Sequence, residues 1–182
     1  RYDLLLHKTG DKECDAATER YTEELISRHV SGRLKVAPEH TNDNVLALMR
    51  KPPFKQFHDF KHIFDRINSK NNLKQQIIPY FISSHPGSTL ESMAELAAET
   101  KQLNFHLEQV QDFTPTPMTM ATEMYYTGIN PETGKNVYVA RSMKEKEAQR
   151  SFFFWYKPEE RKRLSQTLRK IGRFDLIKKL GL

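Results

Sequence analysis

Short apolar runs alternate with longer amphipathic runs through the first two-thirds of the chain, and this alternation limits the possible folds more than any other feature. The short runs have the length and composition of β-strands. We expect strands at Tyr2–Leu6, Leu34–Ala37, Ile77–Ile82 and Leu107–Gln111. The third run, QQIIPYFIS, is continuously apolar, as in a strand that is buried on both faces. Strand–helix alternation predicts an α/β fold with a parallel sheet.

Between the strands, apolar residues recur at helical spacing. The predicted helices cover 12–30, a segment from Thr41 to Pro52, 54–72, and a segment opened by a capping box of Ser88 and Glu91. The helix at 54–72 carries a row of phenylalanines on one face, and the later FFFW run is also aromatic. Both read as core or interface packing, with base stacking on nucleic acid as the alternative.

The pattern changes near residue 122. Residues 124–141 predict a two-stranded hairpin around the turn NPETG, because proline and glycine supply turn geometry. Helical sequence returns at 144–157 and again from Pro158, a residue suited to the first position of a helix. We therefore expect two units, 1–122 as the α/β part and 123–182 as a hairpin plus a basic helical extension.

Composition excludes some classes of protein. With 182 residues, 37% hydrophobic and 29% charged, the chain fits one domain or one domain plus an appendage. No apolar run approaches the ~20 residues that span a bilayer. The single cysteine, Cys14, excludes an internal disulfide and favours a reducing compartment, so we expect a cytoplasmic protein. Because the chain starts without Met, close to an apolar run, it reads as cut inside a domain.

The basic charge is concentrated near the end of the chain. Residues 157–179 contain nine Lys or Arg against three acidic residues, a surplus equal to the net charge of +6 of the whole chain. Such a segment could follow a phosphate backbone, so RNA binding through 157–179 is the alternative function. The simpler interpretation is an amphipathic helix that docks through Leu164, Leu168 and Ile171.

Polar residues follow three of the predicted strands. Glu39 and His40 follow the second strand, Ser83 to His85 follow the third, and Asp112 follows the fourth. In parallel α/β sheets, ligands bind outside the carboxyl ends of the strands, where loops and helix starts meet. Each group taken alone also fits an ordinary loop or cap. Their repetition at three strand ends indicates a binding edge.

Two further patterns carry little functional information. His58 and His62 lie four residues apart, a spacing that can place two imidazoles on one metal ion. No glutamate follows His58 and no third ligand is suggested, so a solvated helix face is favoured. Cys14 lies in a charged helix and reads as a free thiol.

Three segments, LKVAPEHTNDNVLALMRKP, YFISSHPGSTLESM and VQDFTPTPMTMAT, resemble in order and spacing three successive strand–loop units of radical S-adenosylmethionine (SAM) enzymes. The branch concerned includes methylthiotransferases and coproporphyrinogen oxidases. The remainder, YYTGINPETGKNVYVARSMKEKEAQR and KPEERKRLSQTLRKIGRFDLI, resembles the end of YgiQ-type (UPF0313) radical SAM proteins. The resemblance implies the C-terminal half of a radical SAM barrel, partial and TIM-like, with a hairpin and helical extension.

The resemblance also implies ligand-contacting residues. The residue at the position of Glu39 contacts the SAM ribose or methionine moiety in related enzymes, and a basic residue, here Lys51, pairs with the SAM carboxylate. Relatives usually carry Arg there, and Lys keeps the charge without the bidentate fork. Ser84 and Asp112 complete the implied cofactor-binding set. Ser84 and Met118 stand where the motifs have Gly, and no role for His40 carries over.

The family's [4Fe-4S] cluster needs cysteines spaced C-x3-C-x2-C, which this chain lacks. The resemblance therefore implies a fragment of an enzyme, whose intact form would cleave SAM reductively at a cluster held upstream. We expect neither cofactor to bind to this chain alone and expect it to be inactive. Its expected partners are the missing N-terminal half, a second copy through open sheet edges, and RNA. We expect no membrane association.

Overall fold

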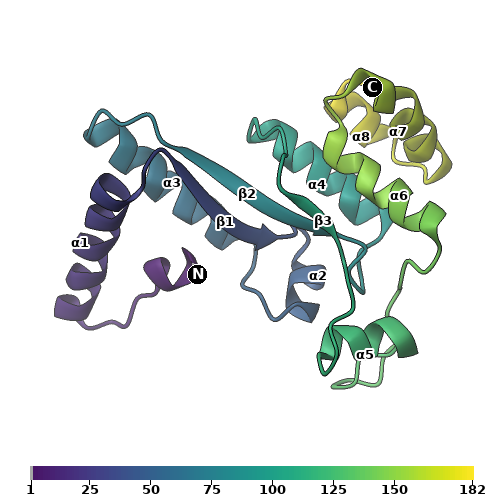
Figure 1. Cartoon of the computed structure of the whole chain (residues 1–182), viewed down its shortest axis with the longest axis horizontal. Coiled ribbons are helices and arrows are strands. Elements are labelled where there is room, and N and C mark those ends of the chain that lie inside the picture. Colours follow the sequence, from purple (N-terminus) through teal and green to yellow (C-terminus); the bar gives the residue numbers. More distant parts are fainter. Residues whose placement is uncertain (1) are drawn as a thin grey trace.

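The computed structural model describes residues 2–182, and its centre is a sheet of three parallel strands (Figure 1). The strands are β1 (Arg33–Glu39), β2 (Gln76–Ser83) and β3 (Val110–Asp112), in the spatial order β1-β2-β3. Helices α2 (Asp43–Leu48) and α3 (Lys55–Lys70) connect β1 to β2, and α4 (Leu90–Gln102) connects β2 to β3. The predicted α/β class and parallel sheet are confirmed.

Strand β2 is buried on one face only. Its residues alternate between buried (Ile77, Pro79, Phe81, Ser83) and half-buried or exposed. In the view of Figure 1, α3 and α4 lie behind the strands, and their buried residues share one core with Ile77 and Phe81. The prediction of a strand buried on both faces is therefore wrong for the part of the chain that the structure describes. The run is apolar throughout because one face of β2 is buried against helices and most residues of the other face are half-buried.

The predicted first strand is also wrong. Residues Tyr2–Leu6 form a 3-10 helix, η1, which packs on α3. The ring of Tyr2 lies 5.9 Å from that of Phe57 and 5.6 Å from that of Phe60. A strand requires a neighbouring strand for its backbone hydrogen bonds, whereas these apolar residues are buried by aromatic contact with a helix.

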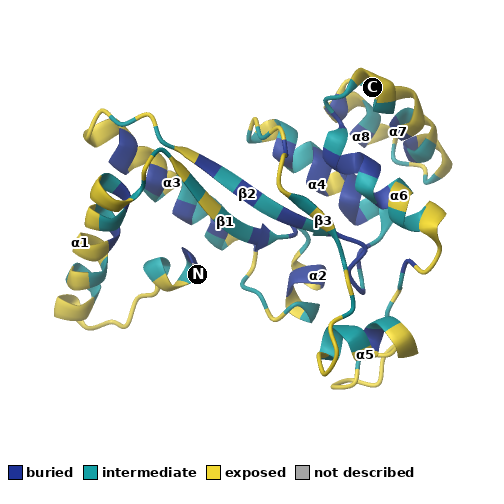
Figure 2. Ribbon diagram, viewed as in Figure 1, coloured by how far each residue is buried: buried dark blue, intermediate teal, exposed yellow. Residues whose placement is uncertain are grey.

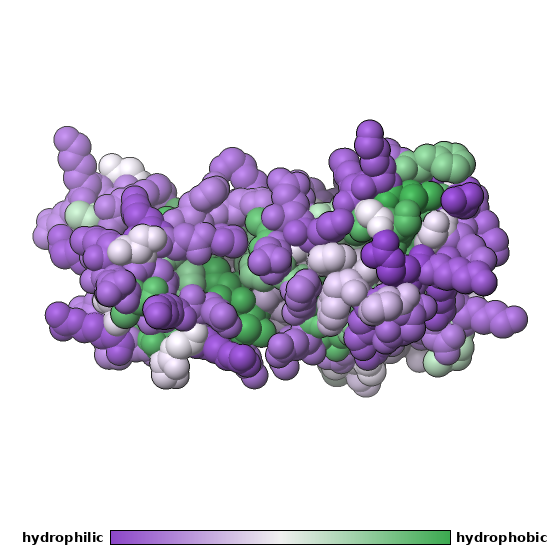
Figure 3. Space-filling view, turned by 90° about the horizontal axis from the view of Figure 1, so that it is seen from above, coloured by the Kyte–Doolittle hydropathy of each residue, from purple (hydrophilic) through white to green (hydrophobic). Residues whose placement is uncertain are grey.

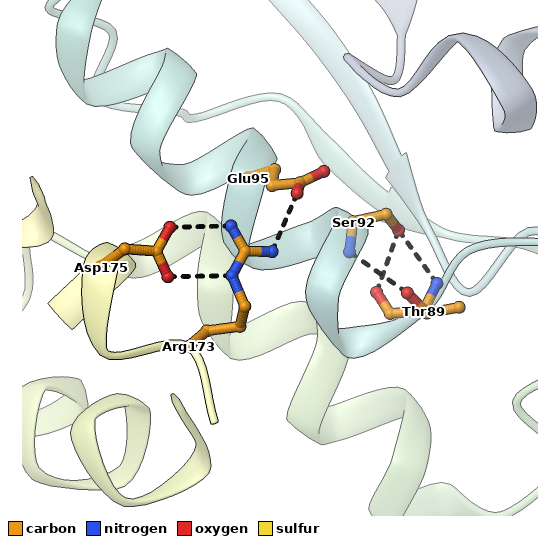
Figure 4. A network of polar contacts seen from close by, with 5 residues as sticks. All are labelled: Thr89, Ser92, Glu95, Arg173 and Asp175. Atoms are coloured by element: carbon orange, nitrogen blue, oxygen red, sulfur yellow. Dashed lines mark hydrogen bonds and ion pairs between the residues drawn. The ribbon is translucent and has the colours of Figure 1, made fainter. Parts of the chain in front are cut away.

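Helix α1 (Lys12–His29) and helix α3 confirm the predicted helices at 12–30 and 54–72. The phenylalanine row of α3 is buried in the core, as predicted. Two predicted caps are shifted by one residue. Asn42, not Thr41, caps α2, and Thr89 with Ser92 forms the capping box of α4 in place of Ser88 with Glu91 (Figure 4).

The predicted hairpin is reduced to one antiparallel bridge, between Ile129 and Asn136. Its first half lies instead in helix α5 (Met120–Thr127). Thr119 caps this helix through its side chain, and Gly128 ends it in the left-handed conformation. Local caps therefore outweigh the β-propensity of the YYT run. Helix α5 extends across residue 122, where the boundary between the two units was predicted. The division into two units stays a prediction.

The C-terminal helices are α6 (Met143–Ser151), the 3-10 helix η2 (Phe152–Phe154), α7 (Pro158–Lys170) and α8 (Phe174–Leu180). Helices α6, η2 and α8 pack on α4, and α7 packs on α6 and α8. Their buried residues, dark blue in Figure 2, belong to the same core as those of α3. Leu164 and Leu168 are fully buried, which confirms the predicted docking of an amphipathic helix. Arg173 joins α8 to α4 by contacting Asp175 and Glu95, each at 2.9 Å (Figure 4).

The surface of residues 2–182 is described by its polarity, by the hydropathy of its helices and by the placement of its potential metal ligands. Seen from above, it is mostly hydrophilic, with apolar atoms gathered in a few places (Figure 3). No described helix is both long and apolar enough to cross a membrane. Among residues 2–182, no three His, Cys, Asp or Glu side chains are placed to hold a metal ion. His58 is only partly exposed and contacts Glu99 at 3.0 Å, and Cys14 is an exposed free thiol.

Candidate functional site

The carboxyl ends of all three strands meet at one edge of the sheet. Glu39 is the last residue of β1, Ser84 directly follows β2, and Asp112 is the last residue of β3. The strands are parallel, and Ser83 lies opposite Asp112 in the register. The prediction that these polar residues share an edge is confirmed.

A cavity of about 470 Å³ opens at this edge. Its walls come from the end of β1, the end of α2, the β2–α4 loop, and the segment from β3 to the start of α5. The lining residues are Glu39, Leu48, Met49, Arg50, Lys51, Ile82, His85, Gln111, Asp112, Phe113, Thr114, Thr116, Thr119, Met120 and Ala121. Three of the four predicted site residues, Glu39, Lys51 and Asp112, are therefore brought together around one space.

Glu39 has an unusual backbone and an incompletely satisfied side chain. Its φ is 70°, and the β1–β2 register shifts between Val36 and Glu39, as at a bulge. One carboxylate oxygen, Oε1, lies 3.2 Å from Lys51 Nζ, while Oε2 is buried without a hydrogen-bond partner. Burial raises the pKa of Glu39, and the charge of Lys51 opposes this rise. The site therefore holds a spare buried acceptor beside a cation.

Lys51 reaches Glu39 because α2 ends in a Schellman motif. The amide of Lys51 donates to Leu46 O and that of Arg50 donates to Ala47 O, while Arg50 adopts a φ of 54°. This turn directs the chain back toward the end of β1. It also sends the two basic side chains apart, since Arg50 forms an ion pair with Glu132.

Asp112 is held from two sides. One oxygen accepts from Ser83 Oγ, and the other lies 3.2 Å from Arg150 Nη1 of α6. The C-terminal region therefore supplies the counter-charge of the β3 carboxylate. Sequence reasoning gave Arg150 no role, because the two residues are 38 positions apart in the chain and local patterns do not reveal such a contact.

His40 has a structural role that the sequence did not reveal. Its Nδ1 accepts from the amides of Thr41 and Asn42, at 2.9 and 3.0 Å, and its Nε2 lies 3.4 Å from Ser88 Oγ. Burial lowers the pKa of His40 to about 3, and the neighbouring His85 contributes further. The imidazole is therefore neutral, with its proton on Nε2.

Gln149 of α6 is fully buried and connects the network around His40 to the β2–α4 loop. Its Oε1 accepts from the Ser84 amide and from Ser88 Oγ, both at 2.9 Å, and its Nε2 donates to Ser88 O at 2.7 Å. Ser88 is engaged here, which explains why Thr89 takes the capping role. No sequence signal marked Gln149, because it lies among charged residues on a helix.

Ser84 lies behind the cavity wall, fully buried, and its Oγ has no partner. Its φ is 61° and that of Met118 is 66°. The resemblance places glycine at both positions, and both keep the left-handed backbone that glycine adopts readily. Gly87 has a φ of 89°, a conformation that a residue with a side chain rarely adopts, and a Cβ there would also displace the end of the Leu48 side chain.

His85 was not among the predicted site residues, although it lines the cavity. Its ring packs edge-on against Phe113, with centroids 5.0 Å apart, and its Nδ1 lies 2.8 Å from Pro86 O. Burial lowers the pKa of His85. Its position directly after Ser83 and Ser84 was the only available signal.

Comparison with known proteins gives one family match and several close relatives. A family described as "Domain of unknown function (DUF3362)" matches residues 108–180. UPF0313 proteins of Bacteroides thetaiotaomicron and Porphyromonas gingivalis are 66% and 62% identical over 99% of this chain. One from Methanosarcina mazei is 43% identical over 97% of it. The chain spans only 27–29% of the length of these three relatives, consistent with a C-terminal part.

Proposed function

The chain corresponds to part of a UPF0313 protein, and from this premise we propose that it forms one wall of the SAM and substrate pocket of a radical SAM enzyme. In this proposal the three parallel strands are a section of a partial TIM-like barrel that the rest of the longer protein completes. The observation that carries the proposal is the spare buried oxygen of Glu39 beside Lys51, on the wall of the cavity at the strand ends.

The residues present fit one portion of SAM. Glu39 Oε2 is a buried acceptor without a donor, and the side chain would have to turn toward the cavity for this oxygen to accept from a ribose hydroxyl or an ammonium group. The Lys51 side chain is about one-third exposed, so its ammonium can contact a ligand carboxylate while it stays near Glu39. These are the contacts that the resemblance assigns to the two positions. A buried acceptor without a donor costs free energy, so a ligand group that donates to Glu39 removes this cost.

The residues present do not fit a [4Fe-4S] cluster. A cluster of this kind takes thiolate ligands, and the one cysteine is an exposed residue of α1. Cluster ligands would have to come from the rest of the longer protein. In the intact enzyme, SAM beside a reduced cluster would supply a 5′-deoxyadenosyl radical. The residues of this chain bind and orient ligands, and we assign them no redox step.

The proposal is tested on the full-length protein, reconstituted anaerobically with iron, sulfide and SAM. The unmodified protein is expected to form 5′-deoxyadenosine. Lys51→Ala should form much less of it, whereas Lys51→Arg should still form it because the positive charge is preserved. Lys55→Ala is the matched control, because Lys55 pairs with Asp59 on the exposed side of α3. Absence of 5′-deoxyadenosine from a protein with a full cluster would contradict the proposal.

RNA binding through residues 157–179 remains a second candidate. Lys162, Arg169 and Lys170 are exposed on the face of α7 opposite its buried leucines. Other basic residues of the segment are engaged internally: Arg173 contacts α4, and Arg161 donates to Gly181 O. The exposed set is therefore smaller than the charge count of the sequence suggests. RNA modification by a radical SAM enzyme would unite the two candidates.

A further inference from the structure

His85 is the cavity residue whose chemistry the proposed function leaves unused. It is 5% exposed and lies in the loop after β2, between the Glu39–Lys51 pair on one side and Asp112 on the other. Pro86 O is a carbonyl and can only accept, so the 2.8 Å contact with Nδ1 places the ring proton on Nδ1. The lone pair of the neutral ring is therefore on Nε2.

The Nε2 atom keeps accessible surface on a residue that lines the cavity. Among the described residues, Glu39 Oε2 and Ser84 Oγ are the fully buried side-chain polar atoms that lack a partner. Nε2 of His85 has no hydrogen-bond partner among the described residues and is not one of these fully buried atoms, so it keeps accessible surface, and the residue itself lines the cavity. Phe113 holds the ring edge-on and limits its rotation.

The surrounding charges are neutralised in pairs. Glu39 faces Lys51, Asp112 faces Arg150, Arg50 faces Glu132, and His40 is neutral. The two carboxylates among the described residues that line the cavity are thus both paired with cations, and neither is free to stabilise an imidazolium at His85. Burial acts in the same direction, because a charged ring loses hydration there.

We propose that His85 is a ligand-contacting residue of this cavity, and that its Nε2 accepts a hydrogen bond from a neutral N–H or O–H group of the bound molecule. The inference rests on the proposed function only in taking the cavity as the place where a ligand binds. It assigns the substrate to a chemical class: a hydroxyl, amide or amino group is required at this corner, and a phosphate or carboxylate is disfavoured. An anion would face a lone pair and would require a protonated ring.

The test uses this chain labelled with ¹⁵N-histidine, with folding checked by circular dichroism. Nuclear magnetic resonance should find the proton of His85 on Nδ1 and that of His40 on Nε2, since the two rings hydrogen-bond through opposite patterns. His85→Gln identifies the resonance by its loss. His40 is the internal control. A proton on Nε2 of His85 would overturn the proposal.

Accessibility and charge preference are tested on the same sample. Diethyl pyrocarbonate acylates an accessible, unprotonated imidazole nitrogen, so it should modify His85 and spare His40. An unmodified His85 in the folded chain would show that Nε2 is sealed and would overturn the proposal. Inorganic phosphate, at ionic strength matched with chloride, should leave the pKa of His85 unchanged. A rise of that pKa in phosphate would show anion binding and would overturn the assigned class.

None of these measurements requires SAM or a cluster. A full-length protein that forms no 5′-deoxyadenosine would therefore contradict the proposed function and leave the assignment of His85 standing. If instead the full-length protein forms 5′-deoxyadenosine and the proton of His85 is found on Nε2, only the inference about His85 is contradicted.

Discussion

At the scale of single residues, the strand-end loops are held by strained backbones and buried polar groups. Positive φ is found at Glu39, at the end of β1, and in the loops after α2, β2 and β3, at Arg50, Ser84 and Met118. Such conformations cost of the order of 1–3 kcal/mol each for residues with a side chain, and they persist where the surroundings fix them. The hydrogen bonds of His40 and Ser84 are part of that fixation.

His40 gives the fold a dependence on acid. Its pKa is about 3 in the folded chain and near 6.5 when unfolded, so the unfolded chain binds the proton more readily. The contribution of neutral His40 to the free energy of unfolding is therefore fully present above pH 6.5 and is lost as the pH falls toward 3, by a maximum of the order of 5 kcal/mol. His40→Asn, which retains an acceptor for the Thr41 and Asn42 amides, should flatten this slope in urea unfolding measured against pH. The exposed His29→Asn should leave it intact.

Met118 offers a test of backbone strain at a fully exposed position. Because its φ is 66° and its side chain contributes little burial, Met118→Gly should raise the free energy of unfolding by up to about 1 kcal/mol. Met143→Gly is the control, since Met143 is exposed at the start of α6 and glycine there should destabilise by about 1 kcal/mol. Equal losses in chemical denaturation would contradict the strain argument.

At the scale of elements, α6 connects the C-terminal helices to the sheet edge. Gln149 and Arg150 are adjacent on this helix, and they reach the β2–α4 loop and Asp112, respectively. The region matched by the DUF3362 family therefore contributes directly to the surroundings of the cavity. This arrangement explains why a helix of mainly charged residues has one fully buried glutamine.

Replacing Gln149 should be costly. Gln149→Leu leaves the Ser84 amide and the Ser88 carbonyl without partners inside the protein, for a loss of about 3 kcal/mol or more in the free energy of unfolding. Gln166→Leu, at an exposed position of α7, should change stability by less than about 0.5 kcal/mol. A loss in Gln149→Leu no larger than in this control would contradict the buried network.

Helix α7 carries the test of RNA binding. Replacing Lys162, Arg169 and Lys170 with Glu should abolish tRNA binding while the fold remains, because these side chains lie on the exposed face of the helix. Affinity of the unmodified chain should fall steeply with salt as phosphates release counterions. Absence of tRNA binding at low salt in a filter-binding assay would leave α7 as a docked structural helix.

At the scale of the whole molecule, one connected core extends from η1 to α8, so the C-terminal helices are not an independently packed appendage in the described chain. The sheet has β1 and β3 as its outer strands. An outer parallel strand has unpaired backbone groups along one side, which favours pairing with another chain or segment. Association with a second copy or with the remainder of the protein stays a prediction.

The isolated chain should be catalytically inert. It lacks the thiolates for a cluster, and the Glu39–Lys51 pair alone offers little affinity for SAM. A partly exposed ion pair of Lys51 with a carboxylate contributes about 1 kcal/mol or less, whereas a 10 µM site requires roughly 7 kcal/mol. Reconstitution with iron, sulfide and SAM should yield no cluster absorbance and no 5′-deoxyadenosine, and calorimetry should show no binding in this range. Formation of 5′-deoxyadenosine by this chain alone would refute the fragment interpretation.

The α/β class, the parallel sheet, the phenylalanine face of α3 and the shared edge of Glu39, Ser84 and Asp112 were all predictable from the amino-acid sequence. These features follow from local periodicity and from the geometry that parallel strands impose on their ends. Each helix or strand buries one face, so its apolar residues recur at a regular spacing that can be recognised in the sequence.

The other features depend on how the elements pack against one another. Tyr2–Leu6 became a helix because aromatic rings of α3 lie beside it, and Ser88 lost the capping role because His40 and Gln149 engage it. Apart from the local bonds of His40, the roles of His40, Gln149 and Arg150 depend on contacts between residues that are 38 to 65 positions apart. Local propensity contains no information on such partners, because they are selected by how the elements pack.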